Sequence, residues 1–362
     1  MIKILVVDDS ALVRKLLGQL LSVEPDFEVR FARNGLEALD QVAAFAPDVI
    51  TLDVHMPELD GLACLDRIMV ERPSRVVMVS SLTAAGADAT LEALRLGAVD
   101  FVAKPAGAVS LHIEQMAAEL VSKVRAAAQT KLKASLRLTE RVRHRIGKSP
   151  AAPARSTAEP RIALVPRASG EGLVLVGAST GGPPALEALL TAMPPDFPWP
   201  ILIAQHMPRT FTGPLARRLD ALCAVHVMEV AQPELLRPGH AYIGRGDADL
   251  IVTRRATGLV AMAAPSQAGY PWHPSADRLV RSAMDHLPAP QLIGILMTGM
   301  GNDGAEAMEV LHTRGGRTIA EAEETAVVWG MPGDLVRRGG ADFVQPLSAI
   351  GGCLLGLVPR CP

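Results

Sequence analysis

The ten residues LVLVGASTGG, Leu173 to Gly182, join an apolar run to a glycine-rich turn. Such a run is typical of a buried strand that leads into a helix. The turn fits three interpretations: a nucleophile elbow that lifts Ser179 above a sheet, a phosphate-binding turn, or only a tight connection. The phosphate interpretation is the weakest, because neither G-x-x-x-x-G-K-[S/T] nor G-x-G-x-x-G occurs here.

The residues around this turn continue an α/β pattern. Apolar runs predict strands in LVLVGAS, PILIAQHM, HAYIGRG and QLIGILMTGM, and helical spacing of apolar residues predicts helices in PPALEALLTAM, FTGPLARRLDAL and SADRLVRSAMDHL. Apolar strands joined by helices form parallel sheets that are covered on both faces. We therefore predict a doubly wound α/β domain over residues 171–362.

Three polar side chains stand at strand ends of this predicted sheet. Ser179 ends one strand, His206 ends the next, and Asp303 follows a third. If these strands are parallel neighbours, the side chains meet at one edge and supply a nucleophile, its base and a carboxylate that orients the base. A hydrolase that pairs Asp303 with His312 is less attractive, because His312 lies within a predicted helix.

The segment TGMGNDG, residues 298–304, has two interpretations. Its glycines bring backbone N–H groups near Met300 close to a reacting carbonyl, which favours an oxyanion hole. Otherwise they only turn the chain into a helix. Among the other histidines, His273 precedes a helix whose N-cap is Ser275 and is a candidate for the wall of a substrate cleft. Structural roles are the ordinary expectation for His226, His240, His286 and His312.

Residues 1–125 predict a second parallel α/β domain, with strands in IKILVVDD, DVITLDV, RVVMVSS and DFVAKP. Each strand ends in a chemically useful side chain. These are Asp8 and Asp9, Asp53, Ser80, and Lys104. Clustered carboxylates suit Mg²⁺, which would offset the repulsion between a carboxylate nucleophile and a phosphoryl group, while the lysine and the serine hold its other oxygens. This arrangement predicts phosphorylation on an aspartate.

Residues 126–170 predict a basic helical extension and a flexible linker between the two domains. From Val121 to Ala168 twelve Lys and Arg face two Glu, a local balance of +10 in a chain whose net charge is −2. The Pro-, Ala- and Ser-rich part, KSPAAPARSTAEP, is typical of a tether. A solvated helix and tether is the simpler interpretation. A basic contact surface for an acidic partner or nucleic acid is the alternative, and no helix-turn-helix or zinc-finger pattern supports it.

Composition limits the remaining possibilities. No apolar run approaches the ~20 residues of a membrane span, and the first residues resemble a strand rather than a signal peptide, so we expect a soluble, cytoplasmic protein without direct membrane insertion. The cysteines show no C-x-x-C spacing, which indicates neither a zinc site nor a disulfide framework. They are Cys64, Cys223, Cys353 and Cys361.

The motifs VVDDS, LDVHMPELDGL, MVSSLT and DFVAKP together resemble a two-component receiver domain. The resemblance spans the first domain and implies a flavodoxin-like fold. It implies that Asp53 accepts phosphate and that Asp8 and Asp9 help to bind Mg²⁺. It also implies that three residues respond to phosphorylation, namely Ser80, Phe101 and Lys104. His55 departs from the usual pattern beside Asp53, which bears on the lifetime of the phosphate.

The second domain resembles the chemotaxis protein-glutamate methylesterases, the CheB family, whose members join a receiver to an esterase. GASTGG, AQHMP, PGHAYIGRGD, HPSAD, LMTGMGNDG and VVWGMP carry the resemblance over essentially the full chain. It implies a Rossmann-like catalytic domain. It further implies a triad of Ser179, His206 and Asp303, with Thr180 and Met300 shaping the site.

The resemblance implies hydrolysis of glutamate γ-methyl esters on the cytoplasmic region of a chemoreceptor, with deamidation of certain receptor glutamines. A chemotaxis histidine kinase is the implied phosphodonor, and the esterase needs no cofactor. The unphosphorylated receiver is expected to block the esterase cleft until Asp53 is phosphorylated. The rival hypothesis is a response regulator whose second domain only binds a partner and whose linker contacts nucleic acid; we expect no nucleic-acid partner.

Overall fold

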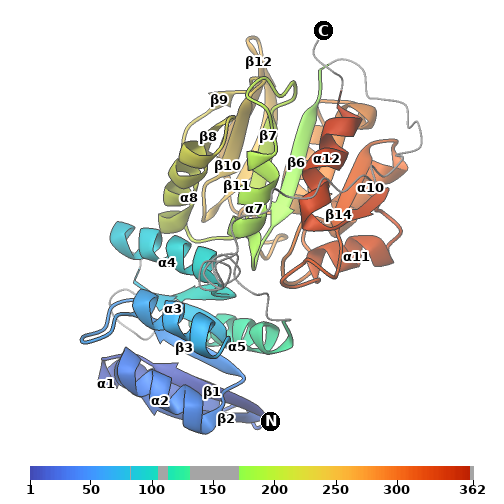
Figure 1. Ribbon diagram of the computed structural model, residues 1–362. Coiled ribbons are helices and arrows are strands. Elements are labelled where there is room, and N and C mark those ends of the chain that lie inside the picture. Colours follow the sequence, from blue (N-terminus) through green and yellow to red (C-terminus); the bar gives the residue numbers. More distant parts are fainter. Residues whose placement is uncertain (82, 105–112, 131–170, 359–362) are drawn as a thin grey trace, which may run out of the picture. The chain divides into compact units, whose positions relative to one another are not determined.

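The computed structural model describes residues 1–81, 83–104, 113–130 and 171–358. The chain divides into two compact units, Met1–Arg161 and Ile162–Pro362, and each is described by itself (Figure 1). The predicted linker lies outside the described residues after Thr130. Among the helices that the structure describes, none combines the length and the apolar character that crossing a membrane requires.

The first unit contains a five-stranded parallel sheet in the order β2-β1-β3-β4-β5, which is the flavodoxin-like doubly wound order. This confirms the predicted fold class. The strands are β1 (Ile2–Val7), β2 (Phe27–Ala32), β3 (Val49–Asp53), β4 (Arg75–Ser80) and β5 (Asp100–Ala103). The helices are α1 (Ala11–Ser22), α2 (Gly35–Phe45), α3 (Gly61–Glu71), α4 (Ala84–Leu96) and α5 (Ile113–Gln129).

Polar side chains start the helices of the first unit. A side-chain oxygen at each N-cap accepts a hydrogen bond from a backbone N–H group of the first turn, which satisfies a donor that the helix itself leaves unpaired. The N-cap residues of α1 to α4 are Ser10, Asn34, Asp60 and Thr83. Helix α5 reaches Gln129 and so includes the first residues of the predicted basic helical extension; Arg125 near its end forms ion pairs with Glu24 and Asp26.

The second unit contains a seven-stranded parallel sheet in the order β15-β14-β13-β6-β7-β10-β8. Its strands are β6 (Leu173–Ala178), β7 (Ile201–Gln205), β8 (His226–Val230), β10 (His240–Gly244), β13 (Leu292–Leu296), β14 (Arg317–Glu321) and β15 (Phe343–Gln345). The helices are α7 (Gly182–Thr191), α8 (Arg209–Leu222), α9 (Ala276–Met284), η1 (Ala289–Gln291), α10 (Ala305–Thr313), α11 (Met331–Arg337) and α12 (Leu347–Leu357).

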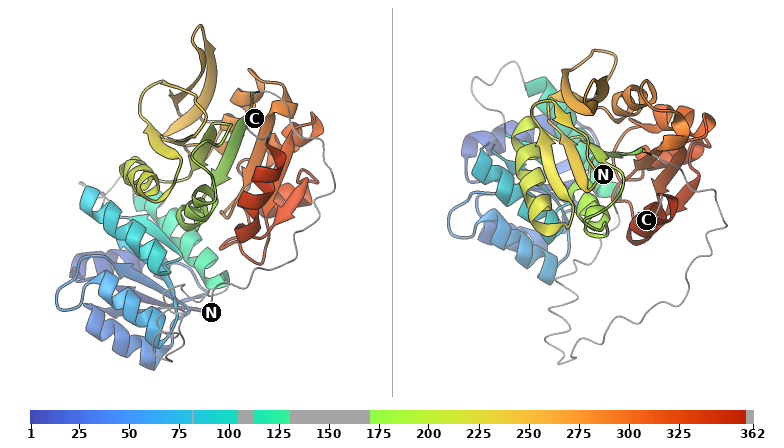
Figure 2. Two further views of the ribbon diagram at one scale, coloured as in Figure 1. Left: turned by 45° about the horizontal axis from the view of Figure 1, so that its top comes forward. Right: turned by 90° about the horizontal axis from the view of Figure 1, so that it is seen from above.

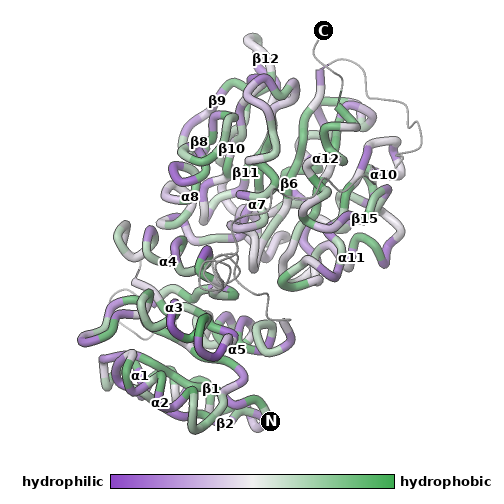
Figure 3. The backbone as a smooth tube through the Cα atoms, viewed as in Figure 1, coloured by the Kyte–Doolittle hydropathy of each residue, from purple (hydrophilic) through white to green (hydrophobic). Residues whose placement is uncertain are grey.

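The helices of the second unit cover both faces of this sheet, which confirms the predicted doubly wound class. Helix α7 packs against α8 and α12, and α10 packs against α9 and α11. Every residue of β6, β7 and β13 is buried, as expected for central strands of a sheet that is covered on both sides. Figure 3 shows β6 largely in green, the colour of hydrophobic residues.

A three-stranded antiparallel sheet was not predicted; one of its strands precedes β10 along the chain, and the other two lie between β10 and α9. Its order is β11-β12-β9, and its strands are β9 (Glu234–Leu235), β11 (Ala248–Arg255) and β12 (Gly258–Pro265). Strands β11 and β12 form a hairpin, which Figure 2 shows in gold beside the larger sheet. The prediction also omitted β8, β14 and β15 of the larger sheet.

The strand order of the large sheet reverses at β6, which lies between β7 and β13. In doubly wound sheets the carboxyl ends of the strands at such a reversal border a crevice, which is the usual ligand site. The segments that follow β6, β7 and β13 begin at Ser179, His206 and Met297. Strand order therefore places the predicted catalytic segments at one edge.

Candidate active site

The turn after β6 is tightly packed around Ser179. The Ser179 N–H group donates to the Thr298 carbonyl (3.0 Å), and the Ser179 carbonyl accepts from Gly182 N (2.8 Å) and Gln205 Nε2 (3.0 Å). A Cβ atom on Gly182 would lie 1.9 Å from Gln205 Oε1, and one on Gly299 would lie 2.8 Å from the Ser179 Cβ. Glycine at these two positions therefore lets three chain segments meet at the serine.

His206 and Asp303 are in direct contact. His206 Nε2 lies 2.7 Å from Asp303 Oδ2, and the exposed fractions of the two side chains are 10% and 2%. The His206 N–H group donates to the Ala178 carbonyl (3.0 Å), which fixes the histidine beside the residue that precedes Ser179. The other ring nitrogen, Nδ1, is buried and has no hydrogen-bond partner among the described residues. One imidazole nitrogen is thus held by a carboxylate, and the other is unoccupied.

The carboxylate of Asp303 also accepts hydrogen bonds from the N-terminus of α9. It accepts hydrogen bonds from Ser275 Oγ (2.9 Å), Ala276 N (2.7 Å) and Asp277 N (3.1 Å). Burial raises the pKa of Asp303, but the hydrogen bond and charge of His206 and these backbone donors outweigh it, so the pKa lies below its usual value. Asp303 is therefore held as a carboxylate by donors at the N-terminus of α9.

The other predicted residues of this unit have definite places. Thr180 is buried, and its carbonyl accepts from Thr298 Oγ1 (2.8 Å), while Met300 lies in the loop that follows β13. His312 Nδ1 lies 3.1 Å from Asp342, so the alternative pairing of Asp303 with His312 is not formed. The structure brings Asp303 to His206 instead.

Sequence reasoning missed several contacts of the site. Ser275 caps α9, as predicted, but its hydroxyl also donates to Asp303. The ring of Trp272 stacks on His206, and Gln205 Nε2 donates to the His206 carbonyl. His273 Nδ1 lies 2.9 Å from the fully buried Asp249, and its place in the wall of a substrate cleft stays a prediction. The segment WHPSAD could have indicated these contacts, because it holds more polar residues than the single N-cap that starts a helix.

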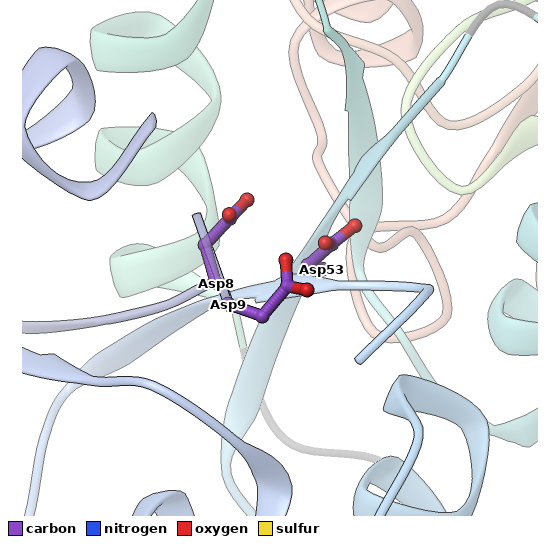
Figure 4. Close-up of side chains that lie close together, drawn as sticks. All are labelled: Asp8, Asp9 and Asp53. Carbon is purple, nitrogen blue, oxygen red and sulfur yellow. The ribbon is translucent and has the colours of Figure 1, made fainter. Parts of the chain in front are cut away.

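Three carboxylates meet in the first unit at the carboxyl ends of β1 and β3. Oxygens of Asp8, Asp9 and Asp53 lie within 4.8 Å of one another, and Figure 4 shows the three side chains gathered in one place. Asp8 and Asp53 are buried and Asp9 is exposed. Lys104 Nζ lies 2.8 Å from an oxygen of Asp8 and 2.8 Å from one of Asp53. A set of hard oxygen ligands at this spacing fits Mg²⁺.

Burial dominates the electrostatics of Asp53. It raises the pKa of this carboxyl, the ion pair with Lys104 lowers it, and the nearby charge of Asp8 raises it again, so that the pKa is above its usual value. Burial lowers the pKa of Lys104, but the two carboxylates outweigh it and the pKa is raised. Because the negative charges of Asp8 and Asp53 repel each other, cations close to both carboxylates stabilise the site.

The remaining predicted residues of the first unit lie on β4, on β5 and in the loop after β3. Ser80 ends β4, and its hydroxyl donates to the Gly86 carbonyl (3.1 Å). Phe101 in β5 is buried, and Lys123 Nζ lies 4.9 Å from the centre of its ring. His55 is exposed, and its backbone N–H group forms a hydrogen bond with Asp53.

Comparison with known proteins assigns both units. The family model described as CheB methylesterase matches residues 174–354, and that described as response regulator receiver domain matches residues 4–114. A protein from Rhodopseudomonas palustris, named protein-glutamate methylesterase/protein-glutamine glutaminase 2, is 56% identical over 98% of both chains. The chain belongs to the CheB methylesterase family. The expected family and enzyme class are thereby confirmed.

Two further comparisons agree with membership in the CheB methylesterase family. A protein from Rhodospirillum rubrum, named protein-glutamate methylesterase/protein-glutamine glutaminase 3, is 51% identical over 99% of this chain and 97% of its own. The crystal structure of the CheB methylesterase catalytic domain of Thermotoga maritima covers 52% of this chain and all of that chain, with 35% identity and a TM-score of 0.50.

Proposed function

We propose that this chain is a phosphorylation-activated protein-glutamate methylesterase. It hydrolyses glutamate γ-methyl esters on the cytoplasmic region of a chemoreceptor to glutamate and methanol, and it deamidates receptor glutamines. The names of its relatives support the substrate class. The observation that carries the proposal is the contact of His206 with the buried Asp303 at the strand ends next to Ser179, with His206 Nδ1 left unoccupied.

The contacts of His206 suggest how the proton moves. Asp303 accepts the Nε2–H group, so the lone pair of Nδ1 takes the Ser179 hydroxyl proton as the serine oxygen attacks the side-chain carbonyl of the substrate. In the best-known serine proteases the two nitrogens have the opposite assignment. The imidazolium then protonates the leaving group as its bond to the carbonyl carbon breaks: the methoxy oxygen leaves as methanol, or the amide nitrogen of glutamine leaves as ammonia. A water molecule, deprotonated by Nδ1, releases glutamate from the acyl-enzyme.

The tetrahedral intermediate needs donors for its negative oxygen. The backbone N–H groups at Thr180 and Met300 are proposed for this role, because the two loops that carry them meet at Ser179 through Gly299. Each well-aimed donor stabilises such an oxyanion by roughly 3 kcal/mol. The low pKa of Asp303 serves the same step, since a permanent carboxylate stabilises the imidazolium that forms.

Asp53 is proposed as the phosphate acceptor in the first unit. Its carboxylate attacks the phosphorus atom of a phosphohistidine on a chemotaxis histidine kinase, the bond between phosphorus and the kinase histidine breaks, and that histidine leaves. Lys104, which pairs with Asp53 before the transfer, then pairs with an oxygen of the new phosphoryl group. Mg²⁺, held by Asp8, Asp9 and Asp53, would neutralise charge on the phosphoryl group. Ser80 and Phe101 would respond to the new phosphate and release the block on the esterase.

Methanol release from methylated receptors tests this function. The rate is expected to rise when Mg²⁺ and a small phosphodonor are added, and Ser179→Ala is expected to abolish release in both conditions. Ser348→Ala, at an exposed position of α12, is the matched control and retains activity. If a folded Ser179→Ala protein released methanol at the wild-type rate, Ser179 would not be the nucleophile. If the wild-type rate did not change when the phosphodonor was added, activation by phosphorylation would be contradicted.

A further inference from the structure

The indole ring of Trp272 lies parallel to the imidazole of His206. The ring centroids are 5.9 Å apart and the planes differ by 2°. Separations of 4.5–7 Å are usual for offset stacking. Because Asp303 approaches the imidazole through Nε2, it lies at the edge of the ring, whereas Trp272 stacks parallel to the plane of the ring. The two contacts therefore act on different parts of the histidine.

Trp272 is held in this position from two sides. A Cβ atom on Gly301, which has a φ of +78°, would lie 2.7 Å from Trp272 Cζ2, so the loop after β13 fits closely against the indole. On the other side, the next residue, His273, contacts the fully buried Asp249 at 2.9 Å, and Asp249 also pairs with Arg278 of α9 (2.6 Å). The tryptophan is thus fixed to the same helix that fixes Asp303.

We infer that Trp272 is a positioning residue for the proposed hydrolysis, which stabilises the His206 imidazolium through the face of its indole ring. The aromatic face attracts a cation whose centre lies within about 6 Å of the ring centroid, and tryptophan is the strongest of the aromatic residues in this respect. The contact is stronger when the ring carries the proton of Ser179 than when it is neutral. It therefore favours the transition state over the ground state.

The same stacking also restricts rotation of the imidazole. His206 Nε2 is held by Asp303, and the parallel indole fixes the plane of the ring, so the direction of the unoccupied Nδ1 is determined before substrate arrives. A merely space-filling role would need only apolar volume at residue 272. Stabilisation of a cation needs an aromatic face, and this difference can be measured.

The test compares Trp272→Leu with Trp272→Phe in the full chain. Both variants keep an apolar side chain, but only phenylalanine keeps an aromatic face. We expect Trp272→Leu to lower kcat for methanol release about tenfold with KM nearly unchanged, and Trp272→Phe to stay within about threefold of the wild type. The rate at which a fluorophosphonate probe modifies Ser179 is expected to follow the same order. If Trp272→Leu does not fold, Trp272→Met replaces it.

This inference rests on the proposed function, and the experiment separates their failures. If the probe modifies Ser179 in the wild type and Trp272→Leu reacts as fast, the inference is wrong and the hydrolase stands. A rise in KM with kcat unchanged also overturns it, because Trp272 then only contacts substrate. If wild-type Ser179 does not react, the hydrolase proposal fails. The upfield ring-current shift of the His206 protons, expected in the wild type and lost in Trp272→Leu, then tests the stacking alone.

Discussion

Asp53, the last residue of β3, and Asp303, in the loop after β13, are both buried aspartates, yet their surroundings shift their pKa values in opposite directions. Asp53 has its pKa raised, because burial and the charge of Asp8 outweigh the ammonium of Lys104 and the backbone N–H group of His55. Burial also raises the pKa of Asp303, but His206 and the N–H groups at the start of α9 outweigh it, so the pKa is lowered. The number of donors around each carboxylate, and not its burial, decides the direction of the pKa shift.

This difference matches the two proposed roles. A phosphate acceptor must give up its partners when the phosphoryl group arrives, and a lysine side chain and a metal ion are partners that can move. A carboxylate that orients a histidine must stay in place, and backbone N–H groups of a helix cannot leave it. We therefore claim that Asp53 is reactive because few hydrogen-bond donors surround its carboxylate, and that Asp303 is inert because many donors surround its carboxylate.

The largest effect is expected from Asp303→Asn. An asparagine cannot accept all the hydrogen bonds that converge here, and its amide favours the wrong tautomer of His206, so we expect a loss of about 10⁴-fold in kcat for methanol release. Phosphorylation of Asp53 should continue in this variant. Asp285→Asn, at an exposed position at the end of α9, is the control. A loss smaller than tenfold in a folded protein would show that Asp303 does not orient the base.

A smaller effect is expected from Ser275→Ala. The change removes one donor to Asp303 and the cap of α9, so we expect kcat to fall about tenfold and the free energy of unfolding to fall by about 1–2 kcal/mol. Ser282→Ala on the same helix also removes hydrogen bonds, to Val252 and Leu279, but not to Asp303. It should lose stability and keep kcat. Equal kcat values for the two variants would assign Ser275 a purely structural role.

Much of the fold followed from local pattern. The central strands are continuous apolar runs because both faces of each sheet are covered, and such runs are easily recognised. The edges of the larger sheet were harder: β15 has only three residues and none is fully buried, so its sequence lacks that signal. The hairpin of β11 and β12 is partly exposed on one side and packs on the sheet, and only long-range contacts reveal its place.

The candidate sites were predictable to a similar degree. Residues at strand ends, such as Ser179 and His206, could be placed together because parallel strands end at one edge. Two other parts of the site could not be predicted: the start of α9, which binds Asp303, and the ring of Trp272. Both come from residues 272–277 and reach the site only through tertiary packing. The assignment of Nε2 rather than Nδ1 to Asp303 is likewise a matter of side-chain geometry and leaves no trace in the sequence.

The pH dependence of the two carboxyl groups tests the central claim most directly. Carbon-13 NMR of protein labelled at the aspartate carboxyl carbons, in Mg²⁺-free buffer, would follow both, with assignments from Asp53→Asn and Asp303→Asn. An unperturbed aspartate titrates near pH 3.9. Because its folded pKa is lowered, Asp303 contributes stability that is present above about pH 4 and lost as the pH falls through its folded pKa; for Asp53, whose folded pKa is raised, the fold favours the protonated form.

As the pH falls from 7, we therefore predict that the Asp53 resonance shifts first, above the ordinary range. The Asp303 resonance should stay at its carboxylate position for as long as the second unit remains folded. If Asp303 took up its proton before Asp53, or if both titrated together, the claim that donor number sets their opposite roles would be contradicted.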